Sequence, residues 1–319
     1  LDYCFIGAVW LIWLVITCVQ QLWHLFDENW FMSVTMAFGS FIAGATSQGG
    51  GAVAFPVMTL IFDIEPKAAR DFSMMIQSVG MTSAAVAIWV KGIKVEKHAL
   101  VFSGIGGAVG ILIGLVWIQN FFEPNPTKVF FVALWLAFGV ALVIINRDPK
   151  APKKEIIADP GPKTKSLLFL TGIGGGMVSG LLGSGLDILV FAFLVLGFRI
   201  CEKVATPTSV ILMAGNSIAG FLFRLLFRDT GPVIESSTWN YWWVCVPVVA
   251  FGAPFGAKFI SRRGRFFIIK LLIFVIFAQF VTAIIVVPFD RNLVILAVVT
   301  FLGGAAIFKG LYNFSHRHL

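Results

Sequence analysis

Long apolar runs separated by short polar turns make up almost the whole chain. Eight of these runs have about the 20 residues that one membrane-spanning helix requires. They lie near 4–25, 69–90, 99–118, 127–146, 204–227, 240–258, 266–287 and 291–313. Two further runs, 31–62 and 166–198, are longer and carry glycines and polar residues near their centres. Because glycine forms helices poorly, we expect each long run to fold as two shorter helices joined by a break. The pattern predicts an all-α polytopic membrane protein with two broken-helix hairpins.

Composition agrees with this interpretation. The chain is 58% hydrophobic and 13% charged, with a mean hydropathy of +0.92, whereas soluble domains carry about 25% charged residues. Outer-membrane barrels alternate apolar and polar residues and lack such runs. The net charge of +8 comes from basic residues in short loops, where they set topology. We therefore expect the lipid bilayer as a partner and no nucleic acid.

The two interrupted runs resemble each other at an offset of 136 residues. Ten positions are identical without a gap, including Gly49 with Gly185 and Lys67 with Lys203. Paired interrupted segments in corresponding places of two halves indicate the site of a secondary transporter. The expected organisation is an N-terminal helix, a first repeat with its hairpin and three helices, a basic linker, an equivalent second repeat, and a C-terminal helix with a tail. In the same order, these parts span 1–26, 27–146, 147–165, 166–287 and 288–319.

Charge predicts the orientation of the helices. The basic loops 91–98, 147–165 and 258–270 face the cytoplasm by the positive-inside rule, and both termini then do so too. Counting crossings from these loops places both ends of 31–62 outside and both ends of 166–198 inside. The two copies therefore form an inverted-topology repeat. We expect hairpin arms of about 13–18 residues, which are either re-entrant or cross with tilt and local thinning.

The two breaks are the candidate substrate site. Backbone N–H groups at a helix start favour an anion, and neutral hydroxyl and amide side chains add donors. The first tip comprises Thr46, Ser47, Gln48, Gly49, Gly50 and Gly51, and the second comprises Gly183, Ser184 and Gly185. Glycines also permit close helix packing. We favour that role for three glycine stripes outside the tips. These are Gly106-xxx-Gly110-xxx-Gly114, Gly172-xxx-Gly176-xxx-Gly180 and Gly252-xxx-Gly256.

Polar residues within the membrane extend this candidate site. Asp187 lies deep in an apolar run, which makes it a candidate for coupling transport to H⁺ or Na⁺. Its alternative role is to cap the following helix. On the helices after the hairpins, Gln77, Asn216 and Ser217 lie on polar faces, where they bind either substrate or a neighbouring helix.

Arginines near the outer edge have other expected roles. Arg70, next to Asp71, is expected to be a paired or snorkelling arginine that can also attract anions at the mouth. Arg224 and Arg228 are expected to anchor their helix at the interface.

Enzyme functions are disfavoured. The four histidines lie at chain ends or in loops, and the four cysteines lack zinc-ligand spacing, so we predict no catalytic residue and no metal. The chain has no Gly-Lys-Ser/Thr phosphate loop. We therefore expect no cofactor and no ATP motor, and coupling to an H⁺ or Na⁺ gradient instead.

The first hairpin also carries a recognisable motif. The pattern Gly-x-x-x-x-Gly-Gly-Gly-x-x-x-x-Pro from Gly44 to Pro56, followed by Ala68-Ala69 and a degenerate second copy, resembles the TauE/SafE sulfite exporter family of the TSUP superfamily. The second copy departs from the motif, with Leu186-Asp187 and Ala192 in place of the later glycines and the proline.

The resemblance implies a transporter of a small sulfur oxyanion or organosulfonate. Sulfite, thiosulfate and sulfoacetate are the expected substrates, and the bacterial inner membrane is the expected location. Together with the inverted repeat, it leads us to expect an alternating-access carrier. One alternative is an anion channel. The other is a membrane sensor or scaffold that binds such an anion without moving it.

Overall fold

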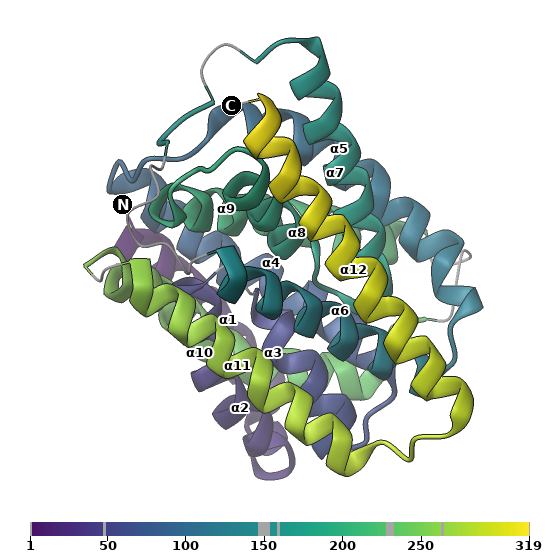
Figure 1. The fold of residues 1–319 in the computed structure, drawn as a ribbon. Helices are drawn as coiled ribbons and strands as arrows, with labels where there is room; N and C mark the ends of the chain where they lie inside the picture. The colour runs from purple at the N-terminus through teal and green to yellow at the C-terminus, as the bar shows by residue number, and fades with distance from the viewer. Residues whose placement is uncertain are drawn as a thin grey trace.

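The protein is a bundle of helices (Figure 1). The computed structural model describes residues 2–46, 49–145, 154–157, 160–227, 233–262 and 265–318, and no β-strand occurs in these ranges. The α-helices are α1 (Asp2–Gln20), α2 (Leu25–Ala45), α3 (Gly50–Pro56), α4 (Pro66–Val90), α5 (Lys97–Val116), α6 (Pro124–Ile145), α7 (Pro162–Leu182), α8 (Leu186–Ala192), α9 (Glu202–Leu226), α10 (Ser236–Ser261), α11 (Arg265–Val286) and α12 (Arg291–His318). The intervening short helices are η1 (Leu22–His24), η2 (Val57–Ile61), η3 (Ile118–Phe121) and η4 (Phe193–Gly197).

Eight helices in the described part of the chain are long and apolar enough to cross a membrane. The segments Cys4–Gln20 and Leu22–Ala45 pass the same test together, with a bend of 108° between them. Large apolar side chains also cover much of the outer surface; Trp89 and Ile285 are 79% and 77% exposed. Such a surface suits lipid rather than water. The prediction of an all-α polytopic membrane protein is confirmed.

The first arm of each hairpin is longer than predicted. α2 begins at Leu25, because Asp27 and Glu28 lie in its first turn, where carboxylates stabilise a helix N-terminus, and do not form a separate turn. α7 begins at Pro162, and proline suits the first helical turn. Both helices have 21 residues and reach about 31 Å, enough to cross the hydrocarbon core. The second arms, Gly50–Ile61 and Leu186–Gly197, have 12 residues each and are slightly shorter than predicted.

The secondary structure repeats at the same offset of 136 residues as the sequence. α3 and α8 each continue into a π-helical segment, η2 and η4, and are followed by the equivalent long helices α4 and α9. The turns before these helices even share a left-handed residue, Asp63 and Arg199, with φ of 49° and 54°. This recurrence supports two structural repeats. The division of the chain at 26, 146, 165 and 287 stays a prediction.

Equivalent helices run in opposite directions. α4 and α9 pack together, and Arg224 near the end of α9 donates from Nη2 to Asp71 Oδ2 near the start of α4 at 2.7 Å. Each hairpin's first arm packs on a helix of the other half, α7 on α5 and α2 on α10. An inverted repeat requires that equivalent helices run antiparallel and that each first arm packs on the other half. The orientation of the repeats in a membrane stays a prediction.

The glycine stripes pack as predicted. A Cβ built on Gly180 would lie 2.7 Å from the Cα of Gly114, so α5 and α7 meet backbone to backbone. Gly252 and Gly256 of α10 lie equally close to Ser40 and Phe41 of α2. Small residues therefore hold the two crossed helix pairs together.

The short arms rest on α6. Phe55 of α3 lies 5.2 Å from Phe131, and Phe191 of α8 lies 6.1 Å from Phe138, measured between ring centroids. Phe55 and Phe191 are equivalent in the two repeats. In Figure 1, α12 crosses the outside of the bundle, and it packs on α6. One buried helix thus supports both breaks.

The linker joins the two halves where it is described. Lys154 pairs with Ile200 in an isolated β-bridge, and the Ile157 N–H donates to Glu96 Oε2 at 2.8 Å. Glu96 is 1% exposed and precedes α5. Residues 154–157 therefore connect the start of α5 with the start of α9.

Candidate substrate site

The two helix breaks meet in the interior of the bundle. The N–H of Gly49, just before α3, donates to Oδ2 of Asp187 in α8. Gln77 of α4 lies between the breaks, and its Nε2 donates to the carbonyl oxygens of Gly183 at 2.7 Å and Ser73 at 2.9 Å. A Cβ built on Gly51 would lie 3.2 Å from the carbonyl oxygen of Gly183. The structure thus brings both predicted tips together around one glutamine.

Asp187 is the charged group at this junction. It is 0% exposed, and its Oδ1 accepts from the Gly185 N–H at 3.1 Å and from the Ser184 hydroxyl at 3.4 Å. With Gly49, all its partners in the described part of the chain are neutral donors. The carboxylate therefore occupies the start of α3, where the sequence predicts a bound anion, and it also supports its own helix start.

Glycine is required where the backbones approach most closely. Gly183 has φ of +77°, a left-handed conformation that side chains rarely adopt, and its Cβ would lie 2.5 Å from the Cβ of Ser73. A Cβ on Gly51 would lie 2.5 Å from Gln77 Nε2. The glycines of the tips therefore allow the two breaks and α4 to touch.

Several buried polar atoms near the junction have no partner among the described residues. Gln77 Oε1 is one, and a Cβ built on Gly49 would overlap it and lie 2.6 Å from Asp187 Oδ2. Both side-chain polar atoms of Asn216 are also unpaired, and this residue lies near the second tip, because a Cβ on Gly107 would meet both it and Leu186. Unpaired buried polar groups are costly and mark places where a ligand or water is needed.

The remaining predicted site residues make no hydrogen bond to the junction that the structure describes, or lie outside the described residues. The Thr46 hydroxyl donates to Ile42 O at 2.9 Å within its own helix, and the buried Ser217 hydroxyl has no hydrogen-bond partner among the described residues. Gly50 starts α3 beside the Gln77 side chain. Ser47 and Gln48 lie outside the described residues.

The structure also adds residues that the sequence analysis did not select. Ser179 Oγ accepts from the Leu186 N–H at 3.0 Å and so satisfies the start of α8. Gln279 of α11 donates to Ala52 O at 2.8 Å, and its Oε1 is unpaired. The sequence could have identified Gln279 as a candidate, because it is an amide side chain within an apolar run. No feature of the sequence distinguishes Ser179 beyond its place in a glycine-rich segment.

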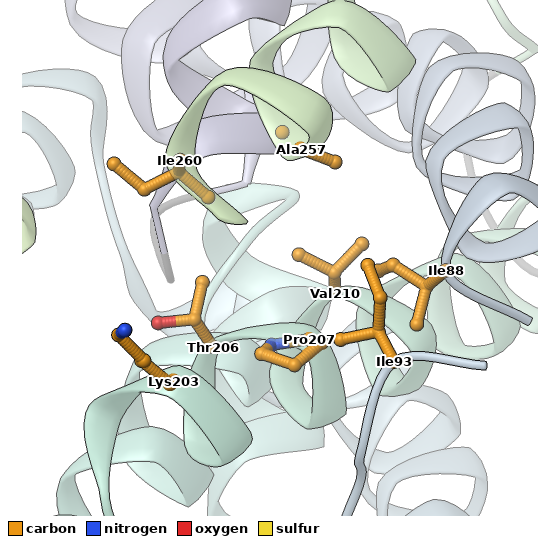
Figure 2. Close-up of a pocket in the computed structure, with 9 residues that line it drawn as sticks. Ile88, Ile93, Lys203, Thr206, Pro207, Val210, Ala257 and Ile260 are labelled. Carbon is orange, nitrogen blue, oxygen red and sulfur yellow. The ribbon is translucent and has the colours of Figure 1, made fainter. Parts of the chain in front are cut away.

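Two cavities approach the breaks from opposite ends of α4. The first has about 240 Å³ and is mostly apolar. Figure 2 shows Ile88 of α4 facing Thr206 and Val210 of α9 across it, and Gly44 near the end of α2 also lines it.

The second cavity has about 400 Å³ and is polar. Lys67 and Arg70 at the start of α4 line it, together with Gln119 and with Leu181 near the end of α7. Lys67 is the equivalent of Lys203 in the first cavity, so the two cavities correspond under the repeat. α4 has 25 residues and a length of about 37 Å, which separates the two cavities.

This fold and this buried junction define a class of protein, the helical membrane proteins with a polar site between broken helices. The model of the family described as sulfite exporter TauE/SafE matches residues 32–284, and the chain belongs to that family. A search of curated proteins found no match. A search of solved structures found none either. The family is a transporter family, which supports a transport role and disfavours an enzyme.

Proposed function

We propose that this protein is a secondary transporter that moves a small sulfur-containing anion across the inner membrane by alternating access. Sulfite, thiosulfate and organosulfonates such as sulfoacetate are the proposed substrates. The observation that carries the proposal is the junction of Gly49, Gln77, Gly183 and Asp187, buried between two cavities at opposite ends of α4. A site reached in turn from either cavity is what alternating access requires.

The donors at the junction suit a singly charged anion. A sulfonate or bisulfite has one negative charge and several acceptor oxygens, which neutral N–H and hydroxyl donors can satisfy. The Asp187 carboxylate accepts a hydrogen bond from the Gly49 N–H. The substrate would displace the Asp187 carboxylate from this N–H. The carboxylate therefore occupies the position at which the transported anion would bind.

This competition supports Asp187 as the coupling residue. Two negative charges at one buried site repel each other strongly. Binding of a proton or a sodium ion to Asp187 would remove this repulsion and free the Gly49 N–H for the substrate. Gln77 Oε1, which has no partner among the described residues and lies beside the same glycine, would then accept a hydrogen bond from the protonated carboxyl group or contact the ion. The substrate and the coupling ion would therefore bind together.

Uptake into liposomes that contain only this protein tests the proposal. Labelled sulfite, thiosulfate, sulfate and a short organosulfonate are compared with and without imposed H⁺ and Na⁺ gradients. We expect saturable uptake of a sulfur anion that one of the two gradients accelerates. Flux that rises linearly with concentration and ignores both gradients would indicate a channel. No flux from folded protein would leave a sensor or scaffold.

Asp187→Asn tests the coupling role in the same liposomes. The amide keeps the size of the side chain and an acceptor oxygen but removes the charge. We expect the variant to lose gradient-driven accumulation while it retains exchange of internal for external anion. Asp290→Asn is the control, because Asp290 is exposed before α12 and asparagine caps a helix equally well. Unchanged gradient-driven accumulation in Asp187→Asn would exclude Asp187 from coupling.

A further inference from the structure

A cluster of buried charged groups lies at the end of the bundle where α4 begins. Asp71 joins Arg70 and Arg224, which are 1% and 6% exposed. Its Oδ1 accepts from Arg70 Nε at 2.9 Å and Nη2 at 2.7 Å, and its Oδ2 accepts from Arg224. The junction of the helix breaks described above does not use any of these three side chains. Their burial is costly, so they need an explanation of their own.

Arg70 retains hydrogen-bonding capacity toward the polar cavity. A guanidinium group has five N–H donors. The Arg70 side chain uses Nε and Nη2 on Asp71 and one Nη1 hydrogen on Gln119 Oε1, which leaves one N–H on each terminal nitrogen. Arg70 and Gln119 both line the cavity of about 400 Å³. This volume exceeds that of a small oxyanion and several waters.

The other charges of this cavity lie at its rim. Glu65, Lys67 and Glu123 line it and are exposed, so water and salt screen them. The Arg70 guanidinium is buried, and its field is screened much less. Among the described residues, the buried cluster holds two arginines against the single carboxylate of Asp71, so an anion that enters the cavity meets an excess of positive charge at Arg70.

In the part of the chain that the structure describes, the equivalent cavity lacks this cluster. Thr206 and Pro207 occupy the positions in the second repeat that correspond to Arg70 and Asp71, and both line the cavity of Figure 2. The repeat explains why equivalent positions line the two cavities, but it does not explain an arginine at only one of these positions. This asymmetry points to a function specific to one entrance.

We propose that the Arg70 cavity is a second anion-binding subsite, where a small oxyanion binds to Arg70 before or after it occupies the helix breaks. Two N–H groups of one guanidinium bind two oxygens of a sulfonate, sulfite or thiosulfate in a fork that lysine does not reproduce. The identity of the anion rests on the proposed function. The site itself rests on the cavity and on Arg70. Leu181 connects this cavity to the second break, two residues before Gly183.

Equilibrium binding of labelled sulfite, which is partly singly charged bisulfite near neutral pH, to the purified full chain in lipid nanodiscs tests the subsite, with unlabelled thiosulfate, sulfoacetate, phosphate and chloride as competitors. We expect two bound anions per wild-type chain, and the Arg70→Gln variant to lose one of them. Arg70→Lys keeps the charge without the fork and should weaken this second site by at least about tenfold, the expected effect of one lost charge-assisted hydrogen bond. Thr206→Val, at the equivalent position, is the matched control and should leave both sites intact.

The outcomes separate this inference from the proposed function. Wild-type binding by Arg70→Gln, or by Arg70→Lys if Arg70→Gln does not fold, would overturn the subsite. The subsite would also be overturned if the wild-type chain binds a single anion and Arg70 substitutions do not change this binding. Saturable flux in the same protein would then still support transport. Arg70-dependent binding without any flux in liposomes would support the subsite and contradict transport.

Discussion

Single side chains replace the backbone hydrogen bonds that the two helix breaks lose. The Leu186 N–H donates to Ser179 Oγ, the Gly49 N–H donates to Asp187, and the Gly183 carbonyl accepts from Gln77. No water is present in the hydrocarbon core, so a break survives there only if protein groups satisfy it. The same residues that form the candidate site therefore also stabilise the breaks.

Gln77→Leu should damage both stability and transport. The leucine fills a similar space but leaves the buried Gly183 carbonyl unpaired, which costs about 1–3 kcal/mol. We expect a lower melting temperature in detergent and the loss of anion uptake in liposomes. Ser78→Ala is the control, because Ser78 is adjacent on α4 and its hydroxyl bonds, among the described residues, only to Met75 O of its own helix. Normal uptake by Gln77→Leu would show that the glutamine only supports the fold.

Part of the candidate site was predictable from residue type alone. Asp187 and Gln77 stand out because charged and amide side chains are rare within apolar runs. The contact between Asp187 and Gly49, which lie in different repeats, was not predictable, because nothing in either segment specifies which helix start the carboxylate reaches. Ser179 was missed because a serine among glycines also reads as a small packing residue.

Helix lengths depend on polar residues at the helix ends, which the pattern of apolar runs does not include. The pattern predicted both breaks and the helices that follow them, and α3 and α8 begin after their glycines as expected. It placed the start of the first arm at residue 31, whereas α2 begins at Leu25, because Asp27 and Glu28 stabilise a helix start. Apolar periodicity finds helices in a membrane but not their polar ends.

Close packing of α5 on α7 gives a test at the level of the helix pair. A Cβ on Gly176 would lie 2.7 Å from the Ile111 backbone nitrogen, whereas a Cβ on Gly174 meets nothing within 4 Å. We expect Gly176→Ala to force the helices apart and to destabilise the protein by about 1–3 kcal/mol. Gly174→Ala, in the same helix, should be neutral or slightly stabilising, because alanine favours helix. Thermal unfolding in one detergent compares the two variants, and equal melting temperatures would contradict this packing.

The whole molecule combines two repeats whose equivalent parts face opposite ends. The antiparallel pair α4 and α9 places Lys67 at one cavity and its equivalent Lys203 at the other. The sequence predicted this arrangement from basic loops and from crossing counts, and the structure supplies the antiparallel contacts. It did not predict that only one cavity carries a buried arginine cluster, because each arginine by itself has the character of an interfacial anchor.

Thiol labelling from each side of the membrane tests this inverted arrangement. Both lysines are exposed, so Lys67→Cys and Lys203→Cys, each in a chain without the four native cysteines, should react with a membrane-impermeant maleimide. In the predicted orientation, Lys67→Cys reacts from outside in intact cells, and Lys203→Cys reacts only in inside-out vesicles. Added substrate should change the two labelling rates in opposite directions if opening one cavity closes the other. Labelling of both cysteines from one side would contradict the inverted repeat, and rates that ignore the substrate would contradict alternating access while leaving the fold unaffected.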